Sequence, residues 1–295
     1  MQVAAPRSGS WVQWIGAPRT ESSGWEEIPN EGWSAVRGKW IGPTGLFLAV
    51  AFVAAGALGA VQPATGLPEE VLQLTQFGPG LGVAAVAAWR PGQVRRLLAG
   101  RGGRGPSGRV LLSAVAVTAV AVAGAALCGV PVAVRDPGSL AAPFGVVAAA
   151  QLLGACGEEV GWRCLLQPLL RERFGPWASS VAVGLAWGCW HVGVFARSPL
   201  YAAGFLTATV AMSVLLGFAW ERVGRWRLAV AGGFHALVNL GLLLFLDQES
   251  GATGPVLLFG AACVLVALPW VLTARRTGRP GRADRAGRAD SIVLI

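Results

Sequence analysis

Eight apolar runs long enough to cross a bilayer constrain this chain more than any other feature of its sequence. A transmembrane helix needs about 20 consecutive apolar residues, and such runs cover residues 43–61, 71–89, 110–131, 142–168, 177–196, 200–220, 228–246 and 254–273. The composition agrees, since 54% of the residues are hydrophobic and 42 are glycines, which let helices pack closely. Barrel strands would alternate in polarity over about ten residues. We therefore predict an all-α polytopic membrane protein, a transmembrane helical bundle of about eight spans over residues 41–274.

The charged residues between these runs predict the orientation of the bundle. Basic residues accumulate on cytoplasmic connections. Here they precede the first run and follow the second, fourth and sixth: Arg37, Lys39, Arg90, Arg95, Arg96, Arg101, Arg104, Arg109, Arg171, Arg173, Arg222, Arg225 and Arg227. The other connections carry Glu69, Glu70, Arg135, Asp136, Arg197, Asp247 and Glu249. We predict a multi-pass protein of the cell membrane with both termini cytoplasmic. The net charge of +9 fits this topology better than a nucleic-acid-binding face.

The two ends of the chain differ from the apolar core. Residues 1–40 hold five tryptophans (Trp11, Trp14, Trp25, Trp33 and Trp40) among Gly, Pro, Ser and Glu without a helical period, and they predict a flexible tail. Residues 275–295 form a basic, low-complexity tail, typical of a disordered anchor near anionic lipid. The five cysteines show no CxxC spacing, so a disulfide framework is not expected.

Two adjacent glutamates, Glu158 and Glu159, lie inside the fourth apolar run. A charged side chain at membrane depth costs roughly 2.5–3.5 kcal/mol, so it usually has a partner and a function. Arg163 follows Glu159 by four residues, which places both on one helical face. We predict that these two neutralise each other. Glu158 lies about 100° further around the helix and is the better candidate for proton transfer.

Both histidines of the chain also lie in apolar runs, His191 in the fifth and His235 in the seventh. Asn239 follows His235 by four residues, so an imidazole and an amide project from one helical face. Trp187 precedes His191 by one turn and is expected to pack beside it. Each of these residues alone is commonly a packing or hydrogen-bonding residue. Their joint occurrence in a chain that keeps nearly all polar side chains out of its spans favours a functional site.

Three motifs, EEVGWR (158–163), WGCWH (187–191) and HALVN (235–239), resemble those of the CAAX protease and bacteriocin-processing (CPBP) family of membrane peptidases. The resemblance covers about residues 142–246 and places the peptidase core there. The second motif of that family often begins with Phe, where this chain has Trp187. The resemblance implies peptide hydrolysis at the membrane, with Glu158 and His191 activating water. It implies that His235 and Asn239 donate to the oxyanion, and that Glu159 and Arg163 support the helix.

The cofactor and the depth of the site remain open at this stage. Glu158, His191 and His235 would make a zinc ligand set with an open position, but HExxH is absent, and a metal-free glutamate mechanism is favoured over zinc. At 1.5 Å per residue, Glu158 lies about 20 Å from the nearest cytoplasmic arginines and His235 only about 12 Å. Tilt, or an earlier start of the seventh span, must bring the two together.

The expected partners are the lipid bilayer and a membrane-associated protein or peptide substrate, either prenylated and CAAX-like or not; nucleic acid is not expected. Two other function classes remain open. A proton-coupled transporter would also use buried Glu, His and Arg, although the chain has no evident repeat of broken helices. A non-catalytic immunity or scaffold protein would keep the motifs without activity.

Overall fold

The computed structural model describes residues 30–99, 107–132, 134–220, 226–246 and 251–277. Throughout this part of the chain the regular elements are helical, and no strand occurs. The helices are α1 (Asn30–Thr65), α2 (Gly78–Trp89), α3 (Pro91–Ala99), α4 (Ser107–Leu127), α5 (Phe144–Gly161), α6 (Gln167–Arg171), α7 (Pro176–Trp190), α8 (Pro199–Trp220), α9 (Arg227–Phe245) and α10 (Thr253–Thr277). The all-helical prediction is confirmed.

Within the described residues, five helical segments are long and apolar enough to cross a membrane: Trp40–Thr65, Ser107–Leu127, Pro199–Ala219, Arg227–Phe245 and Thr253–Ala274. The other three predicted runs are also helical but are interrupted. Residues 71–89 form a 3₁₀ turn and the short α2, residues 142–168 form α5, a π-helical turn and part of α6, and residues 177–196 form α7 and a 3₁₀ turn. The structure is consistent with a multi-pass membrane protein of about eight spans.

The first helix begins earlier than the sequence indicated. The backbone is helical from Asn30, so residues 30–40, which we assigned to the N-terminal tail, extend α1. Residues 1–29 and 278–295, which make up the rest of the two predicted tails, lie outside the described residues.

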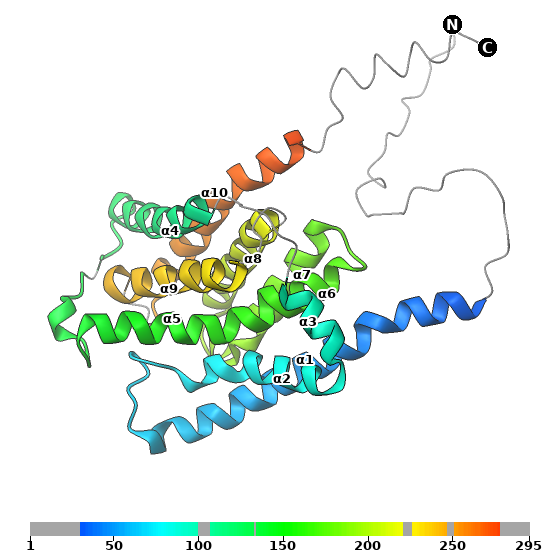
Figure 1. Cartoon of the computed structure of the whole chain (residues 1–295). Coiled ribbons are helices and arrows are strands. Elements are labelled where there is room, and N and C mark those ends of the chain that lie inside the picture. The colour runs from blue at the N-terminus through cyan, green and yellow to red at the C-terminus, as the bar shows by residue number, and fades with distance from the viewer. Residues whose placement is uncertain (1–29, 100–106, 133, 221–225, 247–250, 278–295) are drawn as a thin grey trace, which may run out of the picture.

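Helix α5 lies at the centre of the bundle, between α9 and the antiparallel pair α1–α2 (Figure 1). Glycine allows the close approach to that pair, because a Cβ at Gly161 would lie 2.6 Å from Pro79 Cβ and 2.8 Å from a ring carbon of Phe47. Helix α7 packs equally closely on α8, where a Cβ at Gly184 would lie 2.6 Å from Val210 Cα. Small residues at such positions are typical of helix packing in membranes.

Helix α5 ends in one π-helical turn, Trp162–Leu166, in which the Gln167 N–H donates to the carbonyl of Trp162. Pro168 follows at once and supplies no backbone N–H, so the regular α-helical bonding is interrupted here. Turns of this kind occur frequently at functional sites. The π turn contains Arg163, the last residue of the first motif.

Candidate active site

The two adjacent glutamates of α5 face different neighbours. The Trp187 Nε1–H of α7 donates to Glu158 Oε2 at 2.7 Å. Glu159 Oε1 instead bonds His235 Nδ1 of α9 at 3.0 Å. Both carboxylates are buried, with exposures of 2% and 0%. Successive residues on a helix point about 100° apart, and this separation directs one carboxylate to each neighbouring helix.

Glu159 has a second partner in Arg163, whose Nε lies 3.3 Å from Glu159 Oε2. The sequence spacing predicted this ion pair. The same guanidinium donates to Ser213 Oγ of α8 at 3.0 Å and lies 4.4 Å from the ring centroid of Trp187. The contact between Glu159 and His235 was not anticipated, because nothing local links residues 76 positions apart. Glu159 therefore orients His235 as well as pairing with Arg163.

His191 lies at the end of α7 rather than inside it. The helix ends at Trp190, and His191 takes φ −77° and ψ 64° before the 3₁₀ turn Val192–Ala196. Its Nδ1 lies 2.9 Å from the carbonyl oxygen of Trp187. A carbonyl oxygen only accepts, so Nδ1 carries the proton, and in the neutral ring Nε2 is left as an acceptor. The Trp187 and His191 rings meet edge to face, as expected.

Asn239 lies one turn beyond His235 on α9 and donates from Nδ2 to Gln151 Oε1 of α5 at 3.1 Å. Gln151 was missed from the sequence. It is a buried polar residue in the fourth apolar run, seven residues before Glu158. Seven residues are about two helical turns, so the spacing could have placed Gln151 on the same helical face as Glu158. Gln151 Nε2 in turn donates to the backbone carbonyl of Glu70 at 3.1 Å.

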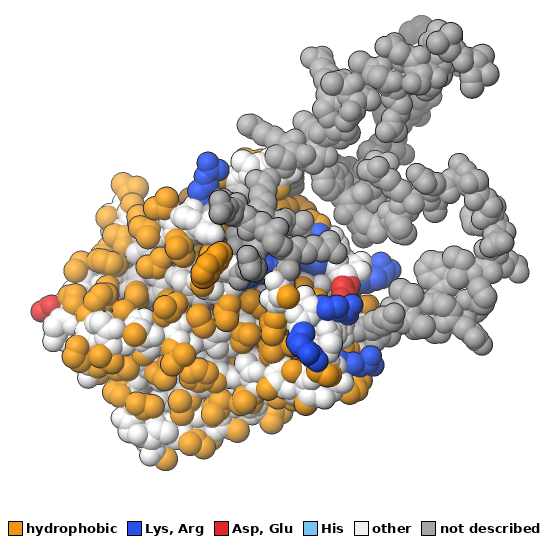
Figure 2. Space-filling model, in the orientation of Figure 1, with side chains coloured by type: hydrophobic (Ala, Val, Ile, Leu, Met, Phe, Trp, Pro, Cys, Tyr) orange, Lys and Arg blue, Asp and Glu red, His pale blue; other side chains and the backbone are white. Residues whose placement is uncertain are grey.

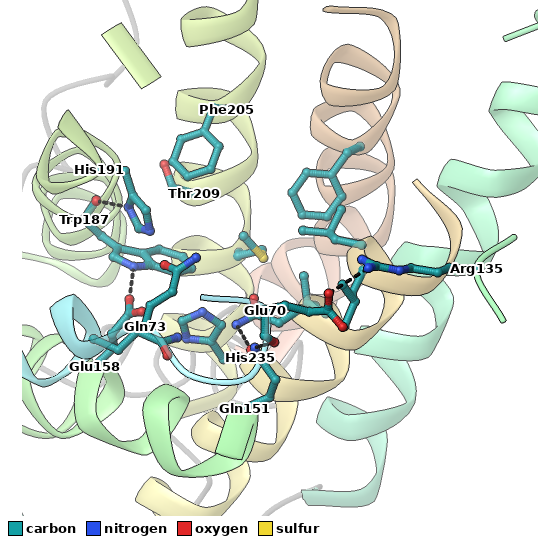
Figure 3. Close-up of a pocket in the computed structure, with 17 residues that line it drawn as sticks. Glu70, Gln73, Arg135, Gln151, Glu158, Trp187, His191, Phe205, Thr209 and His235 are labelled. Carbon is teal, nitrogen blue, oxygen red and sulfur yellow. Dashed lines mark hydrogen bonds and ion pairs between the residues drawn. The ribbon is translucent and has the colours of Figure 1, made fainter. Parts of the chain in front are cut away.

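All four candidate catalytic residues line one cavity of about 210 Å³, together with Gln151 and Trp187. Figure 3 shows Glu158, Trp187 and His191 on one side of the cavity, with His235 beside them. The expected mismatch in depth disappears because the end of α6 and the start of α9 are staggered. Since Glu159 and His235 are in contact, the start of α9 at Arg227 lies deeper in the bundle than the end of α6.

The cavity also has lining residues that the sequence motifs did not indicate, contributed by the loops after α1 and α4 and by α8: Glu70, Gln73, Arg135, Thr209 and Phe205. Within the described residues, no group of three His, Cys, Asp or Glu side chains is placed to hold a metal ion. Glu158 and Glu159 diverge, and each takes a protein donor as partner.

Residues 139–241 match the protein family described as type II CAAX prenyl endopeptidase Rce1-like. This core is CAAX protease-like. The match contains every residue of the three motifs, and the resemblance indicated by those motifs is confirmed. A CAAX prenyl protease 2 from Methanococcus maripaludis is 27% identical over 128 residues, which are 39% of this chain and 47% of that protein. The chain thus spans about half the length of this CAAX protease relative.

Proposed function

We propose that this chain is an intramembrane endopeptidase in which Glu158 and His191 activate water, while His235 and Asn239 stabilise the oxyanion. One observation carries the proposal. A single cavity brings together a carboxylate, an imidazole nitrogen that accepts, a second imidazole and a side-chain amide. Water needs a base to attack an amide carbon, and the developing oxyanion needs fixed donors.

In the proposed reaction, a water held by Glu158 and His191 Nε2 attacks the scissile carbonyl carbon and gives a proton to Glu158. The carbonyl oxygen becomes the oxyanion and accepts hydrogen bonds from His235 and Asn239. The C–N bond then breaks, and the proton on Glu158 passes to the leaving amine. The products are a new carboxyl group and a new amino group, so water is the only co-reactant.

The role of His235 requires a proton on Nε2. Its Nδ1 already donates to Glu159, so donation to an oxyanion needs the imidazolium form. The surroundings favour this form, since Glu158 and Glu159 carry two negative charges against the single positive charge of Arg163. A protonated His235 makes the buried cluster neutral, and burial strongly favours a neutral cluster.

Asn239 would have to exchange its present acceptor for the oxyanion. In the structure its amide donates to Gln151, which holds the donor at the edge of the cavity. The proposed substrate is a membrane-associated protein or peptide, with prenylated CAAX-like proteins as one class. The proposed reaction uses no metal, and its polar groups are those of the chain itself.

The proposal is tested with purified protein in detergent and a library of membrane-proximal and C-terminal peptides, with fragments identified by mass spectrometry. Glu158→Gln, His191→Ala and His235→Ala should each lower the cleavage rate by about 10²-fold or more. Glu172→Gln is the matched control, because Glu172 is exposed and lies outside the cavity. Wild-type cleavage by all three site variants would refute the assignment. Loss of cleavage on chelation, restored by zinc, would refute the metal-free mechanism.

A further inference from the structure

A second cavity adjoins the catalytic one, between α1 and the 3₁₀ turn that follows α7. We call it the α1–α7 groove; it has a volume of about 510 Å³, and its lining includes Phe52, Gly56, Gln73, His191, Gly193 and Arg197. Gln73 and His191 line the catalytic cavity as well. The catalytic cavity itself holds only about 210 Å³. The groove therefore gives a bound polypeptide a continuous path beyond the catalytic residues.

The walls of the α1–α7 groove are mostly apolar and leave open space. Phe52 of α1 and Val194 of the 3₁₀ turn both line it. A Cβ built at Gly56 of α1 or at Gly193 of the 3₁₀ turn would meet nothing within 4 Å. The face of the bundle in Figure 2 is also largely hydrophobic, with most Lys and Arg side chains toward the right. Apolar residues of a substrate chain would thus be well accommodated in the groove.

Arg197 gives the far end of this groove a positive charge. Among the described residues that line the groove, Arg197 is the only one with a permanent charge, and none is acidic. Within the part of the chain that the structure describes, its guanidinium forms no ion pair. It packs on the backbone of Gly251, where a Cβ would lie 2.7 Å from Arg197 Cζ. Tyr201, in the first turn of α8, lines the groove too, and the N-terminus of a helix is its positive end. This end of the groove therefore favours a carboxylate, which matches a planar guanidinium.

The distance between the catalytic histidine and this arginine limits the length of chain that fits between them. His191 and Arg197 flank the 3₁₀ turn Val192–Ala196. At the 3₁₀ rise of about 2.0 Å per residue, the six steps between them cover about 12 Å. An extended peptide covers about 3.3 Å per residue. A stretch of about three to four substrate residues therefore reaches from His191 to Arg197.

We propose that the α1–α7 groove holds the carboxy-terminal end of the substrate and that Arg197 binds its terminal carboxylate. The inference rests on the proposed endopeptidase function and adds a specificity-determining residue to it. The residues between the cleaved bond and the carboxylate lie along the apolar walls. The spacing of His191 and Arg197 then selects a bond close to the chain end.

Peptide binding to the full chain in detergent tests this inference without requiring catalysis. The probes are an alanine–leucine tetrapeptide with a free carboxylate, its C-terminal amide, and an amide whose last residue is aspartate, each followed by fluorescence anisotropy. We expect wild type to bind the free acid about fivefold more tightly than either amide, as for an exposed ion pair. Arg197→Gln should remove this difference. Arg95→Gln, which changes an exposed arginine outside the groove, is the control and should keep it.

Leucine substitutions at two glycines of α1 test the groove itself. Gly56→Leu should weaken binding of the acid and the amide alike, because its side chain would occupy the groove. Gly45→Leu is the matched control, since Gly45 also has open space around it but lies outside the groove. Gly193→Leu repeats the test from the opposite wall should Gly56→Leu fail to fold.

Three outcomes would overturn the inference. They are no preference of wild type for the free acid over its amide, equal affinity for the free acid and the aspartate amide, and unchanged binding in folded leucine variants. Cleavage is scored separately on the same preparations. Wild type that binds as expected but cleaves no peptide would refute the proposed peptidase function and leave the groove assignment standing. Cleavage without a preference for the free acid would refute only the role of Arg197 and the groove.

Discussion

Replacing Trp187 with Phe should slow peptide cleavage without unfolding the protein. The Trp187 indole N–H donates to Glu158 Oε2 at 2.7 Å, inside a pocket where both side chains are buried. The indole N–H holds one oxygen of the Glu158 carboxylate in place through a charge-assisted hydrogen bond. A hydrogen bond to a charged group is worth about 1.5–3 kcal/mol, and about 1.4 kcal/mol is a factor of ten. We therefore expect kcat/KM to fall about 10- to 150-fold, while Phe keeps a ring beside Arg163.

Trp162→Phe is the matched control for this substitution. Trp162 is fully buried, and its indole nitrogen has no hydrogen-bond partner among the described residues. The same loss of volume there should affect thermal stability but leave kcat/KM close to wild type. In spectra of the protein with ¹⁵N-labelled tryptophan, the indole signal missing from Trp187→Phe should be the one that Glu158→Gln displaces. Unchanged kcat/KM in a folded Trp187→Phe, or an equal loss in Trp162→Phe, would refute the reasoning.

Two further substitutions test the ion pair and the helix packing that support the site. Arg163→Met should lower the free energy of unfolding by about 3–5 kcal/mol, because it removes one of the two cations in the buried cluster and leaves that cluster with a net negative charge. Denaturant unfolding in detergent measures this loss, and a loss below about 1 kcal/mol would show that the Glu159–Arg163 pair behaves like a surface one. Gly184→Ala should destabilise the protein by about 1–3 kcal/mol, since its Cβ would lie 2.6 Å from Val210 Cα. Gly45→Ala is the control, because no atom lies within 4 Å of a Cβ built at Gly45. Equal stability of the two variants would contradict the close approach of α7 and α8.

The sequence predicted those parts of the site that depend on local spacing. The pair Glu159 and Arg163 follows from one helical turn, and so does the shared face of His235 and Asn239. The helical class followed from the length and composition of the apolar runs. In each case the prediction needed only the geometry of a single helix, so tertiary contacts did not alter it.

The parts that were missed depend on contacts between segments distant in the sequence. Asn239 meets Gln151 across 88 positions, and Arg135 meets Glu70 across 65. No local pattern encodes such pairs. His191 was expected inside a span, but α7 stops at Trp190 and the following 3₁₀ turn redirects the chain. A run of apolar residues does not reveal that break, because apolar residues line both the helix and the turn.

The central claim is that the adjacent carboxylates have different tasks, Glu158 in proton transfer and Glu159 in holding Arg163 and His235. Measuring kcat and the thermal midpoint for Glu158→Gln and Glu159→Gln under the same conditions tests it most directly. We predict that Glu158→Gln lowers kcat by about 10²- to 10⁴-fold, the usual contribution of a general base, with little change in the midpoint. Glu159→Gln should lower the midpoint clearly, because Arg163 is left buried without its anion. A folded Glu158→Gln with wild-type kcat would contradict the account.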